Sequence, residues 1–158
     1  MNGPSTLVLS LTLLFAGIGI PIMAAINSGL GSKLGNPTLA TVVLFSIALA
    51  SSTLVLWFQS SPVKLDLATV PPQYFMGGLF VAFYVLAMTF VAPRIGVGNA
   101  IFLVLLGQMV SAALIDHHGW LNAPQMGIST MRILGILLVM AGAILVTLSG
   151  RLSAQGFS

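Results

Sequence analysis

The charged and turn-forming residues divide the chain into long stretches that are almost entirely apolar. Polar and apolar positions do not alternate within these stretches, which predicts helices and excludes a membrane β-barrel. A helix crosses a bilayer with about 17–25 predominantly apolar residues, and five stretches fall in that range. The sequence therefore predicts an all-α integral membrane protein with five transmembrane helices, at about residues 7–27, 38–58, 74–92, 99–115 and 132–148.

Glycine, proline and asparagine mark the breaks between the predicted helices. Residues 35–37 (Gly-Asn-Pro) separate the first two stretches, and Pro93-Arg94 ends the third. Proline is favoured in the first turn of a helix, where its missing N–H costs nothing. The loops are all short, so residues 1–158 are expected to form a single transmembrane domain.

Composition removes most other classes of protein. Apolar residues make up 58% of the chain and charged residues only 4%. Soluble globular chains carry about 25% charged residues, and disordered chains have low hydrophobicity, so both are excluded. The five basic residues are spread singly along the sequence, which gives no basic groove for nucleic acid.

The distribution of basic residues gives almost no signal for orientation. With five spans, one membrane face holds Lys64 and Arg132, and the other holds Lys33, Arg94 and Arg151. The membrane face whose short loops carry the excess of lysine and arginine is normally the cytoplasmic one. Here the two faces carry two and three basic residues. Two interpretations remain: insertion in both orientations, or a single orientation set by a weak bias.

Gln108 is the most informative polar residue of the predicted spans. It lies well inside the fourth span, between Gly107 and Ser111. A primary amide in hydrocarbon is costly unless it is hydrogen-bonded, and small neighbours let another helix approach closely. Gln108 is therefore either a bond between helices or part of a substrate cavity.

Three further polar residues are candidates for substrate binding. Asn27 lies at the end of the first span. It either caps the helix, forms a hydrogen bond to another helix or faces a polar cavity. Tyr84 lies near the middle of the third span, where its hydroxyl needs a hydrogen-bond partner. Asn99 opens the fourth span, where the simplest role is a cap.

Asp116 is the only carboxylate near a predicted span and the candidate for ion coupling. An acid at membrane depth would be a candidate proton carrier, whereas at the boundary it can simply pair with a histidine or arginine. The adjacent His117 and His118 do not face each other on a helix, and no wider ligand cluster appears. No metal, cofactor or enzymatic apparatus is expected.

The fifth span is expected to pack rather than to line a transport path. Gly135, Gly142 and Ser149 recur every seven residues, which places them along one face of a helix in left-handed packing. Small residues let helices approach closely in lipid. The stripe therefore predicts a packing and dimerisation helix.

Several of these segments resemble one family. Residues 107–119 (GQMVSAALIDHHG) resemble the fourth-helix signature, G-Q, seven residues, D-x-x-G, of YdcZ-like proteins in the drug/metabolite transporter superfamily. Residues 77–85 are similar to that family's third-helix start, 93–96 to the turn that follows, and 27–37 to its first-helix end. The family often has a glutamine four residues before the asparagine of the first helix, where this chain has Met23.

The resemblance implies a five-helix subunit of a small-molecule exporter in the inner membrane. It implies assembly as an antiparallel homodimer, or as a heterodimer with a related small membrane protein, in the lipid bilayer. Two oppositely inserted halves would supply the inverted repeat that alternating access uses. The alternative is a non-transporting accessory or assembly protein with the same helix interfaces and no solvated cavity.

Overall fold

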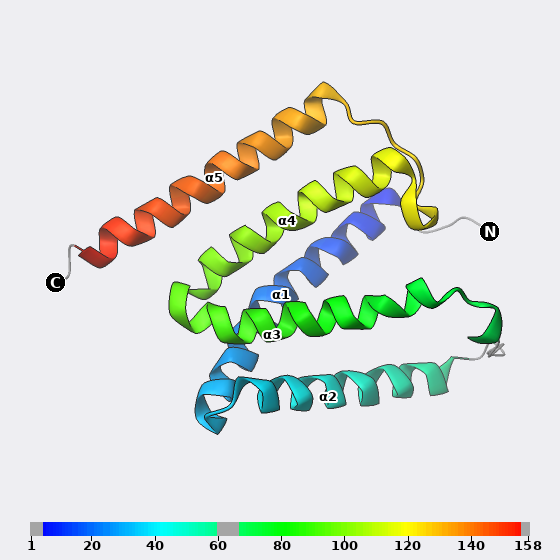
Figure 1. Ribbon diagram of the computed structural model, residues 1–158, viewed down its shortest axis with the longest axis horizontal. Helices are drawn as coiled ribbons and strands as arrows, with labels where there is room; N and C mark the ends of the chain where they lie inside the picture. The colour runs from blue at the N-terminus through cyan, green and yellow to red at the C-terminus, as the bar shows by residue number, and fades with distance from the viewer. Residues whose placement is uncertain (1–4, 60–66, 156–158) are drawn as a thin grey trace. The chain divides into compact units, whose positions relative to one another are not determined.

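The computed structural model describes residues 5–59 and 67–155 and contains five long helices there (Figure 1). All five are long and apolar enough to cross a membrane, so the prediction of five membrane-spanning helices is confirmed. Short 3-10 helices lie at Leu67–Thr69, Pro72–Met76 and Trp120–Asn122. The long helices are α1 (Thr6–Leu34), α2 (Pro37–Phe58), α3 (Gly77–Ile95), α4 (Val97–His118) and α5 (Thr130–Gln155).

Several helix ends differ from the sequence-based expectation, and α5 runs to Gln155 where an end near residue 148 was expected. α1 continues past residue 27 because its glycines are tolerated inside the helix, and it ends at Gly35, whose φ of 63° gives a left-handed cap. α3 starts after the Pro72–Met76 turn and runs through Pro93. It ends at Ile95, where Gly96 with φ 88° turns the chain into α4.

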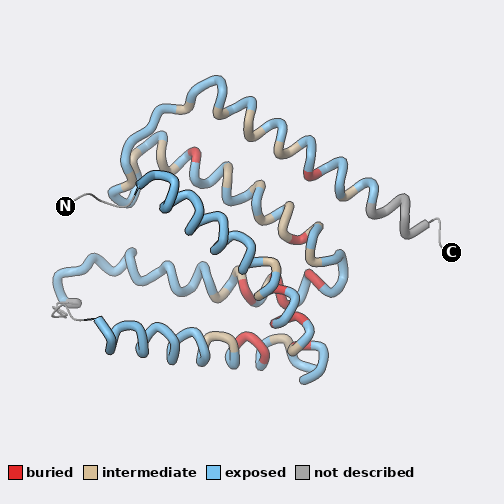
Figure 2. The backbone as a smooth tube through the Cα atoms, turned by 180° about the vertical axis from the view of Figure 1, so that it is seen from behind, coloured by how far each residue is buried: buried red, intermediate tan, exposed pale blue. Residues whose placement is uncertain are grey.

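The chain separates into two compact units, Met1–Arg94 and Ile95–Ser158. In the first unit, buried residues gather where the second half of α1 meets the start of α2 and the second half of α3 (Figure 2). Small side chains allow this close approach in place of a bulky core. The buried residues of this unit are Ala24, Asn27, Ser28, Gly31, Ala40, Thr41, Val85, Met88, Thr89 and Ala92.

The second unit is a helical hairpin of α4 and α5. Ala113 of α4 and Ala143 of α5 are both 4% exposed. Most large apolar side chains in both units are exposed, including Leu13 at 73% and Leu138 at 72%. In a chain that crosses a membrane, such surface is available to lipid or to another subunit.

Candidate functional site

Asn27 links α1 to α3 through a buried hydrogen bond. Its Nδ2 donates to Thr89 Oγ1 at 2.5 Å, and the Thr89 hydroxyl donates to the Val85 carbonyl at 2.7 Å. Both linked side chains are 3% exposed. Because α1 continues for two more turns, Asn27 is not a helix cap, and the structure gives it the interhelical bond.

Gly31, one turn after Asn27, brings three helices into close contact. A Cβ atom at this position would lie 3.2 Å from Pro37 Cα and 3.2 Å from Thr89 Cγ2. Carbon atoms in optimal contact are about 3.5–4.0 Å apart. The absence of a side chain at Gly31 therefore permits the packing that places Thr89 beside Asn27.

An open groove of about 340 Å³, here called the α1–α2 groove, runs between α1 and α2. Asn27 supplies its polar side chain, and the rest of the lining is apolar. Met23 lies one turn before Asn27, and Pro21 lies in the same stretch of α1. Proline removes one intrahelical hydrogen bond and leaves the carbonyl four residues earlier without its usual donor. The lining includes Gly19, Met23 and Asn27 of α1 and Val43, Leu44 and Ile47 of α2.

Tyr84 contributes a buried hydroxyl to the first unit. Its ring is partly exposed, but the hydroxyl oxygen is buried and has no hydrogen-bond partner among the described residues. Phe80 and Phe83 on the same helix are 69% and 74% exposed, so they point outward and do not enclose it. Buried hydroxyls are normally bonded, so the Tyr84 hydroxyl is an unsatisfied polar group within the described part of the first unit.

Asn99 and Gln108 do not come together, although both lie on α4. They are nine residues apart, which at 3.6 residues per turn places them on opposite faces. Asn99 Nδ2 donates to the Ile95 carbonyl at 2.8 Å and so stabilises the turn into α4 without capping its first residue. Gln108 is exposed and makes no side-chain hydrogen bond among the described residues.

Asp116 pairs with Arg132 and holds the two helices of the hairpin together at one end. Arg132 Nη2 lies 2.6 Å from Asp116 Oδ2, and the two side chains are 30% and 29% exposed. His117 Nδ1 accepts from the Ile128 N–H at 3.4 Å, and His118 stacks on Trp120. Within the described ranges, no three His, Cys, Asp or Glu side chains form a group that could hold a metal ion.

Sequence reasoning missed Thr89, the partner of Asn27. A hydroxyl inside an otherwise apolar stretch, Met88-Thr89-Phe90, was the available signal. Its importance depends on a contact between residues 62 positions apart. That contact could not be inferred from local spacing.

Comparison with known proteins identifies the family. The chain matches the family model DMT_YdcZ, whose description reads "Putative inner membrane exporter, YdcZ", over residues 8–145. No curated protein and no solved structure matches the chain closely enough to be counted as similar. The matched region contains all or most of each of the five membrane-spanning helices. The chain therefore belongs to the YdcZ family, and it is a multi-pass protein of the inner membrane.

Proposed function

We propose that the chain is one subunit of a secondary transporter that exports a small molecule by alternating access. Both units form one transmembrane domain, and two oppositely inserted chains form an antiparallel dimer. The exporter description of the family supports the direction of transport. The observation that carries the proposal is the α1–α2 groove.

The groove has the properties of a site for an apolar or amphipathic organic molecule. Its volume of about 340 Å³ falls in the usual range of about 300–1,000 Å³ for ligand sites. Such sites are mostly apolar with a few polar groups that orient the ligand. Asn27 is positioned to play that role, and the neighbouring Pro21 lies inside α1, where it leaves one backbone carbonyl without its usual donor beside the groove.

Gln108 supports the need for a second subunit. Its exposed amide lies in the middle of α4 and has no partner within the described part of the chain. Such a group is costly against lipid. In the proposed dimer Gln108 contacts the other chain or the substrate. Asn27 and Tyr84 contribute to the same substrate site, while Asn99 stabilises the turn between α3 and α4.

Transport by purified protein in liposomes tests the proposal. The vesicles are loaded with a panel of lipophilic cationic and neutral dyes, and a pH-sensitive dye reports proton movement. Met23→Trp fills the α1–α2 groove and is expected to abolish transport. Leu13→Trp adds the same ring to the same helix at a 73% exposed position outside the groove and is expected to keep transport. Equal loss in both variants would remove the groove from the path, and wild-type vesicles that move no dye would favour the accessory-protein alternative.

Topology is tested with a reporter fused to the C-terminus. The near-even basic count predicts that the reporter is found on both faces of the membrane. Lysines added after Arg151 should move it to one face. A wild-type population in one orientation would contradict the homodimer and leave the heterodimer with an oppositely inserted relative.

A further inference from the structure

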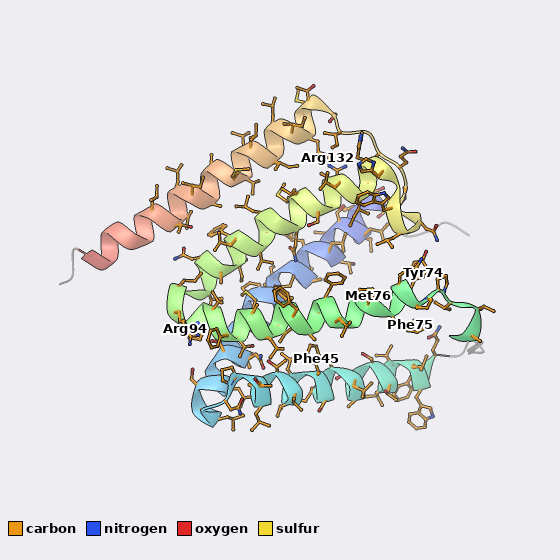
Figure 3. The ribbon with its side chains drawn as sticks, viewed as in Figure 1. Phe45, Tyr74, Phe75, Met76, Arg94 and Arg132 are labelled. Carbon is orange, nitrogen blue, oxygen red and sulfur yellow. The ribbon has the colours of Figure 1, made fainter. Side chains whose placement is uncertain are left out.

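A second pocket opens in the first unit, where α1 ends, α2 begins and α3 ends. Its volume is about 400 Å³, and its polar lining comes from Ser28, Ser32, Thr89 and Arg94. Figure 3 shows Arg94 at the end of α3. This cavity, here called the Arg94 pocket, differs from the α1–α2 groove because it contains a cation and several hydroxyl groups.

The guanidinium of Arg94 is held in place by Phe90. Its Cζ lies 3.6 Å from the centroid of the Phe90 ring, and Nη1 donates to the Phe90 carbonyl. A guanidinium has five N–H donors in a planar fork. The contact with Phe90 uses one of them and orients the head group, so the remaining donors are available to an oxyanion.

The described residues provide no carboxylate that could neutralise Arg94. The chain has two acidic residues. Asp116 is paired with Arg132 in the second unit, and Asp66 lies outside the described residues. Within the described part of the first unit, Arg94 and Lys33 are therefore cations without an acidic partner.

Ser28 is an independent sign of a ligand. It is 7% exposed and lines the Arg94 pocket. Its hydroxyl makes no hydrogen bond within the described ranges, although the neighbouring Ser32 hydroxyl donates to the Ser28 carbonyl at 3.1 Å. This hydroxyl is therefore free to donate to a group bound in the pocket.

We propose that the Arg94 pocket binds a phosphate group through the guanidinium of Arg94 and the hydroxyl of Ser28. The planar fork of arginine matches the oxygen spacing of phosphate. The pocket lies at the ends of membrane-spanning helices, where anionic lipid headgroups attract basic side chains. The phosphate belongs either to such a headgroup or to a phosphate-bearing solute.

The test uses the full-length protein purified in a neutral detergent. Native mass spectrometry measures binding of phosphatidylglycerol, with phosphatidylcholine as the zwitterionic control. In the second arm, thermal unfolding is followed during a titration with inorganic phosphate. The variants are Arg94→Gln, Ser28→Ala and Lys33→Gln, the last removing one positive charge from the same end of the unit without lining the pocket.

Arg94→Gln is expected to weaken binding by about tenfold or more, because a charge-assisted hydrogen bond is lost. Ser28→Ala is expected to weaken it by about fivefold, and Lys33→Gln by less than about twofold. A preference for phosphatidylglycerol assigns the site to lipid. Saturable protection by inorganic phosphate, without a lipid preference, assigns it to a solute.

Two results would overturn the proposal. Equal weakening by Arg94→Gln and Lys33→Gln would show diffuse surface attraction, and failure of both probes to bind the wild-type protein would show no site. Circular dichroism checks that the variants keep their helices. If Arg94→Gln does not fold, Ser28→Ala decides, because its hydroxyl bonds to nothing in the described structure.

Discussion

Two glycines on α1, Gly29 and Gly31, are predicted to respond oppositely to the same substitution. Among the described residues, an added Cβ at Gly29 meets no atom within 4 Å, whereas at Gly31 it meets Pro37 Cα and Thr89 Cγ2, each at 3.2 Å. Those neighbours belong to α2 and α3. Neither can yield without moving a helix or disturbing the bond between Thr89 and Asn27.

The magnitude follows from two opposing effects. Alanine is a better helix former than glycine by about 1 kcal/mol, and both variants gain that amount. Gly31→Ala also overpacks a buried contact, which costs about 1–3 kcal/mol. The helix-propensity gain cancels in the comparison, so Gly31→Ala should be less stable than Gly29→Ala by about 2 kcal/mol, roughly a 30-fold difference in the unfolding equilibrium.

Unfolding in mixed micelles with increasing sodium dodecyl sulfate, followed by near-UV circular dichroism, measures this difference. Gly29→Ala should unfold at or above the wild-type midpoint, and Gly31→Ala below it. Far-UV spectra serve as the control that both variants remain helical. Equal midpoints for the two variants would refute the close packing of α1 against α2 and α3 at Gly31.

Three further predictions concern the second unit. Gln108→Leu should fold normally and lose transport in liposomes, since its amide has no structural partner in the described chain; a wild-type rate would remove it from the site, and failure to assemble would make it a bond between helices. Asp116→Asn should lower the free energy of unfolding by at most about 1 kcal/mol, because the pair with Arg132 is about 30% exposed, and should leave the pH profile of transport unchanged; loss of proton-coupled transport would make Asp116 the coupling residue. Gly142→Leu should weaken a dimer in detergent while the monomer stays helical, because an added Cβ meets nothing within 4 Å among the residues that the structure describes; an intact dimer with a disrupted monomer would show that the stripe packs internally.

The sequence by itself determined the class of protein and the number of spans. Seven charged residues in 158 leave uncharged stretches that only a bilayer accommodates, because every backbone polar group in lipid must be bonded within a helix. The signature around Gln108 and Asp116 also indicated the family, which the match over residues 8–145 confirms.

Helix ends were only partly determined by the sequence. Gly29, Gly31 and Gly35 all looked able to stop α1, but only Gly35 has a positive φ. Gly31 remains helical and its missing side chain admits α2 and α3, whereas Gly29 remains helical on an exposed face of α1. A glycine in the sequence does not reveal which of these roles it has.

Only the tertiary structure decided which polar groups meet. It paired Asn27 with Thr89 and Asp116 with Arg132. The reason is that these helices are apolar on nearly every side, so no amphipathic stripe selects the face that each turns inward. Helix rotation is set instead by local fits such as the one at Gly31, where α2 and α3 approach α1 closely. The hydrogen bond between Asn27 and Thr89, which are 62 positions apart, lies beside that contact.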